Sequence, residues 1–327
     1  MIIRDGILFH NVEELEETPG GFRMWRLPKD VRNCLNPGIY EPDNCLSTGI
    51  ELRFQMLGNG VDLYLRADTR EEVSVAHIYY GSVQGGWRNS TRMILSDRTK
   101  IHIDAPNNMD ELKQLTKENH FPFSPEVVRV VLPYTRCFYL GVEGEVAPPR
   151  PDQLPEKTYL AYGSSITHGS LALVQPYTYP FRIAQLLGTD YLNYGFAGSA
   201  KLEPEIAEYI CSRKDWSFAS LELGINVLKM DEDEFARRTD FFTARMAEDP
   251  RPVFATSVFK TLNNEPRAQL FREIVRRYAK DRLIFTEGLD LLGNRAWISQ
   301  DGVHPTLEGI ASITENWSRV MKESISL

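Results

Sequence analysis

The sequence predicts two domains: a β-sandwich over residues 1–145 and an α/β domain with a five-stranded parallel sheet over residues 157–327, joined by a linker over 146–156. Three observations support this prediction. Short segments with alternating apolar and polar residues fill the first part, prolines cluster near residue 150, and short apolar runs alternate with amphipathic stretches in the last part. The length of 327 residues also fits two domains at roughly 150 residues each.

The first part of the chain has the pattern of strands joined by turns. Apolar and polar residues alternate in Ile50–Met56 and in Val61–Arg66, and the turn residues Leu57–Gly60 between them predict a hairpin. Because successive side chains of a strand point to opposite faces, we expect one face of each strand to be buried and the other hydrated. Two further segments have strand character and a third is more helical: Val73–Tyr79, Val127–Val131 and Met109–Asn119.

The segment from Glu145 to Pro155 contains four prolines in eleven residues. Proline fixes φ and removes a backbone donor, so this composition indicates a stiff, extended connector. We therefore expect the domain boundary here.

The last part of the chain has the alternating pattern of a parallel α/β sheet. Its five short apolar runs are Thr158–Tyr162, Asp190–Tyr194, Phe218–Leu223, Pro252–Ser257 and Arg282–Thr286. Helical patterns such as Phe181–Leu187 and Glu265–Lys280 lie between them, and a last helix is expected to begin at Pro305. Ligands of such sheets bind beyond the carboxyl ends of the strands.

Composition narrows the range of functions. With 37 Lys and Arg against 45 Asp and Glu, the net charge is −8, so we do not expect a nucleic-acid partner. The N-terminus shows no secretory pattern, and no stretch approaches the roughly 20 apolar residues of a membrane helix, so no membrane association is expected. The four cysteines (Cys34, Cys45, Cys137 and Cys211) have no CxxC spacing, and we interpret them as free thiols of a cytoplasmic protein.

Polar and glycine-rich segments follow the first three predicted strands, and another precedes the last helix. They are Gly163–Thr167, Asn193–Ser199, Glu222–Asn226 and Asp301–Pro305. Each has an ordinary explanation as a turn or a helix cap. However, all four positions face the same crevice in an open parallel sheet.

The segment Asp301–Pro305 has a pattern that suits proton transfer. Asp301 and His304 are three residues apart in a tight turn, so the carboxylate can bind Nδ1 of the imidazole. That bond fixes the tautomer and leaves Nε2 able to take a proton from a nucleophile such as a serine hydroxyl. A surface turn that caps the final helix is the alternative.

The order of the four segments resembles the SGNH hydrolases, also called the GDSL-like esterase/lipase family. The blocks of that family are a Gly-Asp-Ser turn, an Asn-x-Gly-x-x-Gly turn, a Gly-x-Asn-Asp turn and a C-terminal Asp-x-x-His. The resemblance covers about residues 150–327 and implies a flavodoxin-like three-layer fold for that part.

Carried over by position, the resemblance implies a role for each matching residue. Ser165 would be the nucleophile, His304 the general base and then the general acid, and Asp301 the residue that orients His304. The oxyanion hole would consist of the Ser165 N–H, the Gly198 N–H and the Asn226 side-chain amide. No metal and no cofactor is expected, because these groups suffice for acyl transfer.

This sequence departs from the family pattern at two positions. Ser164 replaces the Asp before the nucleophile, and Val227 replaces the Asp after Asn226, so other groups must orient these two elements.

Two residues are weaker candidates for site roles. Gly195 could replace Gly198 as a donor, and His168 could replace His304 as the base, although a role in the wall of the site suits His168 better.

Residues outside these blocks have weaker signals. His10, His77, His102 and His120 lack the spacing of a metal site, so we expect structural or solvent-facing roles. Trp87, in a glycine-containing turn, could stack on a sugar, but we expect it to pack at the domain boundary.

The function expected from this reading is a serine esterase that removes small acyl groups, with acetyl as the expected group, from a carbohydrate or another polar alcohol. A β-sandwich before an SGNH domain is similar to the arrangement in carbohydrate esterase family 2. An acyltransferase with the same triad is the alternative, and a carbohydrate-binding or scaffold protein with an inactive hydrolase domain is a third hypothesis. The expected ligand is a small acyl ester such as an acetylated sugar, and the sequence leaves open whether the chain forms a homo-oligomer.

Overall fold

The computed structural model describes residues 2–68 and 73–325, which form two compact units. The first unit contains the chain up to Lys29, Glu41–Glu156 and Val174–Pro176; the second contains Asp30–Tyr40, Lys157–Leu173 and the chain from Tyr177 onward. The expected boundaries therefore need two corrections. Residues 30–40 belong to the second unit, and residues 146–156 belong to the first instead of forming a separate linker.

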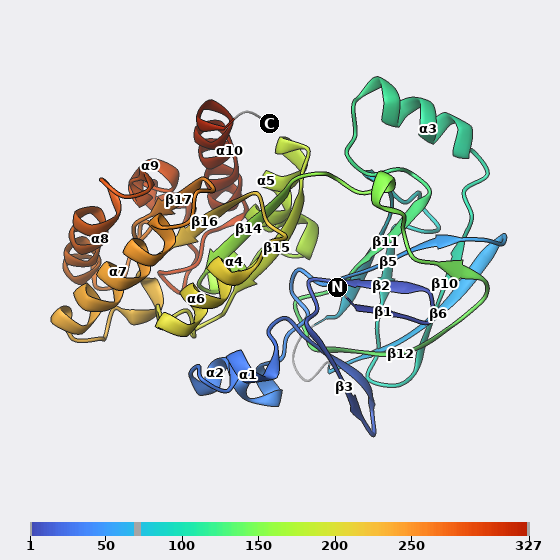
Figure 1. Cartoon of the computed structure of the whole chain (residues 1–327), viewed down its shortest axis with the longest axis horizontal. Coiled ribbons are helices and arrows are strands. Elements are labelled where there is room, and N and C mark those ends of the chain that lie inside the picture. The colour runs from blue at the N-terminus through green and yellow to red at the C-terminus, as the bar shows by residue number, and fades with distance from the viewer. Residues whose placement is uncertain (1, 69–72, 326–327) are drawn as a thin grey trace. The chain divides into compact units, whose positions relative to one another are not determined.

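The first unit is a β-sandwich of two antiparallel sheets (Figure 1). Within the described ranges, the larger sheet has eight strands: β1 (Ile2–Arg4), β2 (Ile7–His10), β5 (Glu51–Met56), β7 (Val75–Tyr80), β8 (Val83–Gln84), β9 (Thr91–Met93), β11 (Val127–Val131) and β13 (Val146–Ala147). The smaller sheet has five strands there: β3 (Glu14–Thr18), β4 (Gly21–Trp25), β6 (Gly60–Ala67), β10 (Thr99–Asp104) and β12 (Cys137–Glu143). Short helical segments complete the unit: η1 (Pro42–Asn44), α3 (Met109–Glu118) and η2 (Pro151–Gln153).

The hairpin expected between residues 50 and 66 is wrong, because its two strands lie in different sheets. β5 pairs with β2 and β11, whereas β6 pairs with β10 and β12. The turn after Met56 is thus a corner between the sheets. The apolar side chains of both strands still enter one core, in which Leu52 and Phe54 of β5 and Leu63 and Leu65 of β6 are fully buried.

The proline-rich segment after Glu145 is part of the first unit because its polar groups bind strand β5. β13 pairs with β5, and the Gln55 side chain donates to the Pro148 carbonyl at 3.0 Å. The Gln153 amide donates to Gln55 Oε1 at 2.9 Å and to Glu126 Oε2 at 2.9 Å. Because of these bonds, the segment packs as part of the first unit and is not the extended connector expected from the prolines.

The outer face of β5 is buried instead of hydrated. Glu51, which is 0% exposed, accepts hydrogen bonds from Arg53 Nε at 2.8 Å and from Arg129 Nε and Nη2 at 2.8 and 2.7 Å. The guanidinium carbons of both arginines lie over the Phe123 ring, 5.0 and 3.9 Å from its centroid. Burial acts to raise the pKa of Glu51, but the two guanidinium groups outweigh it and lower the pKa from 4.5 to about 2.

The second unit has a five-stranded parallel sheet with the order β15-β14-β16-β17-β18 (Figure 1). Its strands are β14 (Thr158–Gly163), β15 (Asp190–Gly195), β16 (Phe218–Glu222), β17 (Val253–Thr256) and β18 (Ile284–Thr286), close to the five expected runs. The fold class expected for both parts of the chain is confirmed. β15 lies on one side of β14 and β16, β17 and β18 lie on the other, so the strand order switches at β14. In open α/β sheets, ligands generally bind at the carboxyl ends of the strands beside such a switch.

Helices cover both faces of this sheet. Helices α5 and α10 pack together on one face, and α6, α7 and α8 form a row on the other (Figure 1). The helical segments of the unit are α2 (Pro37–Tyr40), α4 (Ser165–His168), α5 (Tyr179–Leu187), α6 (Pro204–Ser212), η4 (Ile225–Val227), α7 (Glu232–Ala247), α8 (Glu265–Ala279), α9 (Gly288–Leu291), η5 (Arg295–Trp297) and α10 (Leu307–Ser324). Two further segments, α1 (Lys29–Arg32) and η3 (Gln175–Tyr177), span the boundaries between the units.

The last helix begins at Leu307, two residues after the expected start. Pro305 instead forms an isolated antiparallel bridge with Ile298, and the Thr306 side chain caps the helix by accepting from the Gly309 N–H. The helix has one buried apolar face, on which Ile313 and Trp317 are fully buried.

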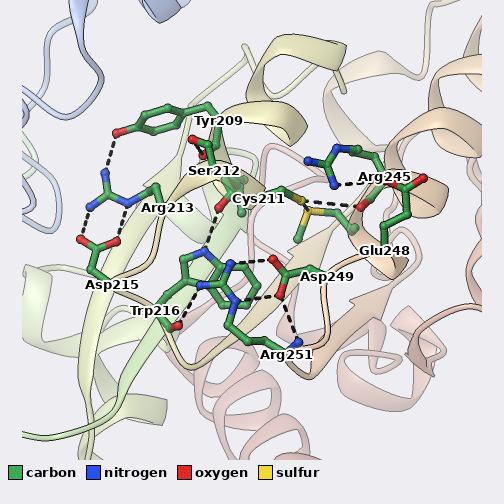
Figure 2. A network of polar contacts seen from close by, with 12 residues as sticks. Tyr209, Cys211, Ser212, Arg213, Asp215, Trp216, Arg245, Glu248, Asp249 and Arg251 are labelled. Carbon is green, nitrogen blue, oxygen red and sulfur yellow. Dashed lines mark hydrogen bonds and ion pairs between the residues drawn. The ribbon is translucent and has the colours of Figure 1, made fainter.

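A network of polar contacts lies at the amino ends of strands β16 and β17, opposite to their carboxyl ends (Figure 2). Arg251, just before β17, binds Asp249 through two hydrogen bonds of 2.7 and 2.6 Å, and its guanidinium lies 3.3 Å from the centroid of the Trp216 ring. Trp216, just before β16, donates from Nε1 to the Ile210 carbonyl at 2.8 Å. The amino ends of β16 and β17 are thereby tied to α6.

Three further expectations concern single residues and membrane helices. The four cysteines are free thiols, with Cys34 exposed and the other three buried. Trp87 is 98% exposed within its unit, so the packing role expected for it is not seen there. Among the described residues, no helix combines the length and apolar character that crossing a membrane requires.

We predict that Glu51→Gln lowers the free energy of unfolding at pH 7 by about 3–5 kcal/mol, because two buried guanidinium groups lose their carboxylate. The pKa of Glu51 is lowered in the folded state, so its stabilisation is complete above pH 4.5 and is lost as the pH falls toward 2. Urea unfolding should therefore show a gap between wild type and variant that shrinks at acidic pH. Glu143→Gln, at an exposed position, is the control. Equal stability of Glu51→Gln and wild type at pH 7 would contradict the prediction.

Candidate active site

Ser165 follows the carboxyl end of strand β14 and is the first residue of helix α4. The turn forms because Ser164 adopts an extended conformation and its hydroxyl accepts a hydrogen bond from the Ile166 N–H at 3.1 Å, which caps the helix. Ser165 is 8% exposed. The change from strand to helix lifts its hydroxyl out of the sheet.

A continuous chain of hydrogen bonds joins Ser165, His304 and Asp301. His304 Nε2 is 2.8 Å from Ser165 Oγ, and Nδ1 is 2.7 Å from Asp301 Oδ2. Since a carboxylate can only accept, Nδ1 carries the proton, and Nε2 is free to accept the proton of the serine hydroxyl. The structure thus brings together the three residues expected to form the triad.

The turn around Asp301 holds its carboxylate rigidly. Asp301 Oδ1 accepts hydrogen bonds from Ser299 Oγ at 2.8 Å and from the N–H groups of Val303 and His304 at 2.8 and 2.9 Å. Burial acts to raise the pKa of Asp301, but the hydrogen bonds from His304, Val303 and Ser299 outweigh it and lower the pKa well below the ordinary value. Asp301 is therefore ionised and able to stabilise a protonated imidazole.

The neighbouring loop after β17 fixes the same turn from outside. Asn263 Nδ2 donates to the Asp301 carbonyl at 2.6 Å, and the Leu262 N–H donates to the Gly302 carbonyl at 2.8 Å. Sequence reasoning missed Asn263 and Ser299, because their partners are set by the fold or by a turn whose geometry no motif specifies.

The expected oxyanion donors lie on the loops after the two strands that flank β14. Gly198 follows β15 and has a φ of 68°, a conformation that glycine adopts without strain. Asn226 is in η4, after β16, and its Oδ1 accepts from the Ala200 N–H at 3.1 Å. This bond orients the Asn226 amide, so Ala200 supplies the contact that Val227 cannot make.

Gly195 has a packing role. A Cβ atom at Gly195 would lie 2.2 Å from the His168 backbone nitrogen, so only glycine allows β15 to approach α4 this closely. Of the two glycines considered as donors, Gly198 has open space around it, whereas Gly195 lies against the helix.

A buried carboxyl group takes part in the turn where Ser164 replaces Asp. Glu222, at the end of β16 and 2% exposed, accepts from the Ser164 N–H at 2.6 Å and from Thr167 Oγ1 at 3.2 Å. Its burial raises its pKa, an effect that hydrogen bonds from Ser164 and Thr167 only partly offset. Sequence reasoning missed Glu222, although an acidic residue inside an apolar run was a usable signal.

His168 is buried beside the loop after β15. His168 is 2% exposed, and its Nδ1 accepts from the Ala197 N–H at 3.4 Å, which places it against the loop after β15. In the part of the chain that the structure describes, no group of three or more His, Cys, Asp and Glu side chains could hold a metal ion.

Comparisons with known proteins agree with this arrangement. Residues 156–240 match the model of the GDSL-like lipase/acylhydrolase family. A search of curated protein sequences found no match. The resemblance to SGNH hydrolases that the four segments indicated is thus confirmed.

The similarity to several solved structures extends over both units of this chain. A salicylyl-acyltransferase, SsfX3, from a tetracycline biosynthetic pathway has a TM-score of 0.74 at 16% identity, covering 98% of this chain and 95% of the other. A family two carbohydrate esterase from Clostridium thermocellum, in complex with cellohexaose, has a TM-score of 0.61 at 12% identity over 98% and 99% of the two chains. An acetyl xylan esterase from Butyrivibrio proteoclasticus has a TM-score of 0.57 at 10% identity over 99% and 97%.

The fold, the geometry of the site and the family match agree with one another. The second unit has the parallel α/β fold and the Ser-His-Asp arrangement found in SGNH (GDSL-like) hydrolases, and the two-unit chain is similar in fold to the family two carbohydrate esterase and the acetyl xylan esterase.

We predict that Asn226→Ala slows ester hydrolysis by about 10²–10³-fold, because one donor to the developing oxyanion is removed. Initial rates with p-nitrophenyl acetate measure the effect, and circular dichroism checks the fold. Asn316→Ala removes a comparable side-chain contact, to the Leu291 carbonyl, and should retain the wild-type rate. An unchanged rate in Asn226→Ala would remove Asn226 from the oxyanion site.

Proposed function

We propose that this protein is a serine esterase that removes a small acyl group, with acetyl as the expected group, from a carbohydrate or another polar alcohol. The observation that carries the proposal is the hydrogen-bonded series Ser165 Oγ, His304 Nε2, His304 Nδ1 and Asp301 Oδ2. A serine hydroxyl becomes an effective nucleophile only when a neighbouring base withdraws its proton, and this geometry provides that base.

In the first half of the proposed reaction, Ser165 Oγ attacks the carbonyl carbon of the ester and its proton passes to His304 Nε2. The new negative charge on the carbonyl oxygen is stabilised by the Ser165 and Gly198 N–H groups and the Asn226 amide. Asp301 stabilises the protonated imidazole. The bond to the alcohol then breaks, the alcohol leaves with the proton from His304, and the acyl group remains on Ser165.

In the second half, a water molecule takes the place of the alcohol. His304 removes a proton from this water as its oxygen attacks the acyl carbon. The bond to Ser165 breaks, the proton returns to the serine oxygen, and the free acid departs. The mechanism uses only side-chain and backbone groups of the second unit.

Two considerations support a carbohydrate as the alcohol. The family two carbohydrate esterase and the acetyl xylan esterase are similar in fold to this chain over both of its units. The family two esterase is in complex with cellohexaose. A shared fold leaves the substrate open, so this part of the proposal depends on analogy. A cytoplasmic location remains a prediction from the sequence.

We expect Ser165→Ala to lower the rate of p-nitrophenyl acetate hydrolysis by at least about 10³-fold while the fold is retained, since no acyl-enzyme can form. Ser212→Ala, which removes a serine far from the triad in the network of Figure 2, is the matched control. A panel of acetylated sugars against longer acyl esters then tests the substrate. Equal rates in wild type and Ser165→Ala would refute the serine mechanism, and preference for long acyl chains would refute the small-acyl assignment.

Acyl transfer is the second candidate function, because the same acyl-enzyme can react with an alcohol other than water. The fold similarity to SsfX3, which is described as a salicylyl-acyltransferase, favours keeping this candidate. For an esterase, we expect the release of acetate to equal the consumption of acetyl ester when sugar alcohols are added. Chromatographic recovery of an acetylated acceptor as the main product would instead establish transfer.

A further inference from the structure

The segment Asp30–Tyr40 comes from the N-terminal part of the sequence but belongs to the second unit. Leu35 and Ile39 are each 6% exposed, which anchors the segment by apolar contact. Three of its polar contacts reach the loop between β15 and α6 that carries Gly198 and Ala200. We call residues 196–203 the oxyanion loop.

Asn36 makes three hydrogen bonds to this loop. Its Nδ2 donates to the Ser199 carbonyl at 2.9 Å and to Glu203 Oε1 at 2.6 Å, and its backbone N–H donates to the same carboxylate oxygen at 3.1 Å. The remaining side-chain oxygen accepts from the Gly38 N–H at 3.1 Å. Both ends of the Asn36 amide are therefore engaged, and its orientation is fixed.

The contact at Gly38 is equally close. A Cβ atom at Gly38 would lie 1.7 Å from Ser199 Oγ, so the segment touches the loop through backbone at this point. Ser199 lies directly between Gly198 and Ala200 in the sequence. The position of both of those residues therefore depends on how Ser199 is held.

The oxyanion loop in turn orients Asn226, because the Ala200 N–H donates to Asn226 Oδ1. That bond leaves the Asn226 NH₂ group as the donor for a substrate oxygen. A series of contacts thus runs from Asn36 through Ser199 and Ala200 to Asn226.

We propose that Asn36 is a positioning residue of the catalytic machinery: it holds the oxyanion loop so that the Gly198 N–H and the Asn226 amide meet the developing oxyanion. This inference rests on the proposed serine-esterase function. Donors to an oxyanion act only when their geometry is held to a fraction of an ångström, so a small shift of the loop lowers the rate without removing any donor.

The test is the steady-state kinetics of Asn36→Ala with p-nitrophenyl acetate. We expect kcat to fall about ten- to a hundredfold while KM changes less than about threefold, since the loop acts on the transition state. Asn316→Ala is the matched control and should leave both parameters unchanged. Thermal unfolding of each variant shows whether the fold is retained. A folded Asn36→Ala variant with wild-type kcat would overturn the proposal.

A double-mutant cycle with Asn226→Ala separates positioning from a general structural effect. If Asn36 acts through Asn226, the two losses in kcat do not multiply, and the double variant is faster than their product. Losses that multiply would show that Asn36 does not act through Asn226.

Gly38→Ala provides a second variant in case Asn36→Ala does not fold. Gly38 has no positive φ and lies in a helical turn, so alanine strains chiefly the contact with Ser199 and also comes within 3.1 Å of Asn36 Oδ1. We expect the same fall in kcat at nearly constant KM, and wild-type kinetics would contradict the proposal. If Asn226→Ala and Ser165→Ala both retain activity, the proposed function fails; if only the Asn36 and Gly38 variants do, this inference alone fails.

Discussion

The hydrogen bond between Asp301 and His304 is the interaction on which the geometry of the site depends. One carboxylate oxygen is occupied by the turn itself, through Ser299, Val303 and the His304 N–H, so only the other faces the imidazole. The ring then has one orientation, with Nε2 directed at Ser165. A flexible carboxylate would permit several ring positions, most of them out of reach of the hydroxyl.

Much of the second unit could be predicted from its sequence because parallel sheets are buried on both faces. Buried strands appear as continuous apolar runs, and the polar residues just past them must lie at one edge. Ser165, Gly198 and Asn226 follow the first three such runs, and Asp301 and His304 share one turn. Local patterns were therefore enough to predict that Ser165, Asp301 and His304 lie at the same end of the sheet.

The rest could not be predicted, because it depends on contacts between distant residues. Alternation in β5 and β6 is equally consistent with a hairpin and with two strands facing each other across a core, since both bury Leu52 and Leu63. The contacts of Asn263 to Asp301 and of Asn36 to Ser199 join positions 38 and 163 residues apart. Neither belongs to a motif, so only the folded chain reveals them.

Residues 30–40 belong to the second unit although they lie within the N-terminal part of the sequence, and this limits where the chain can be divided into its two units. The second unit is not one uninterrupted stretch of the sequence, because the segment Asp30–Tyr40 belongs to it. Recombination that exchanged the whole N-terminal region would also exchange that piece. The two parts are therefore inherited together, and a new β-sandwich needs a segment that still fits the loop of Ser199 and Glu203.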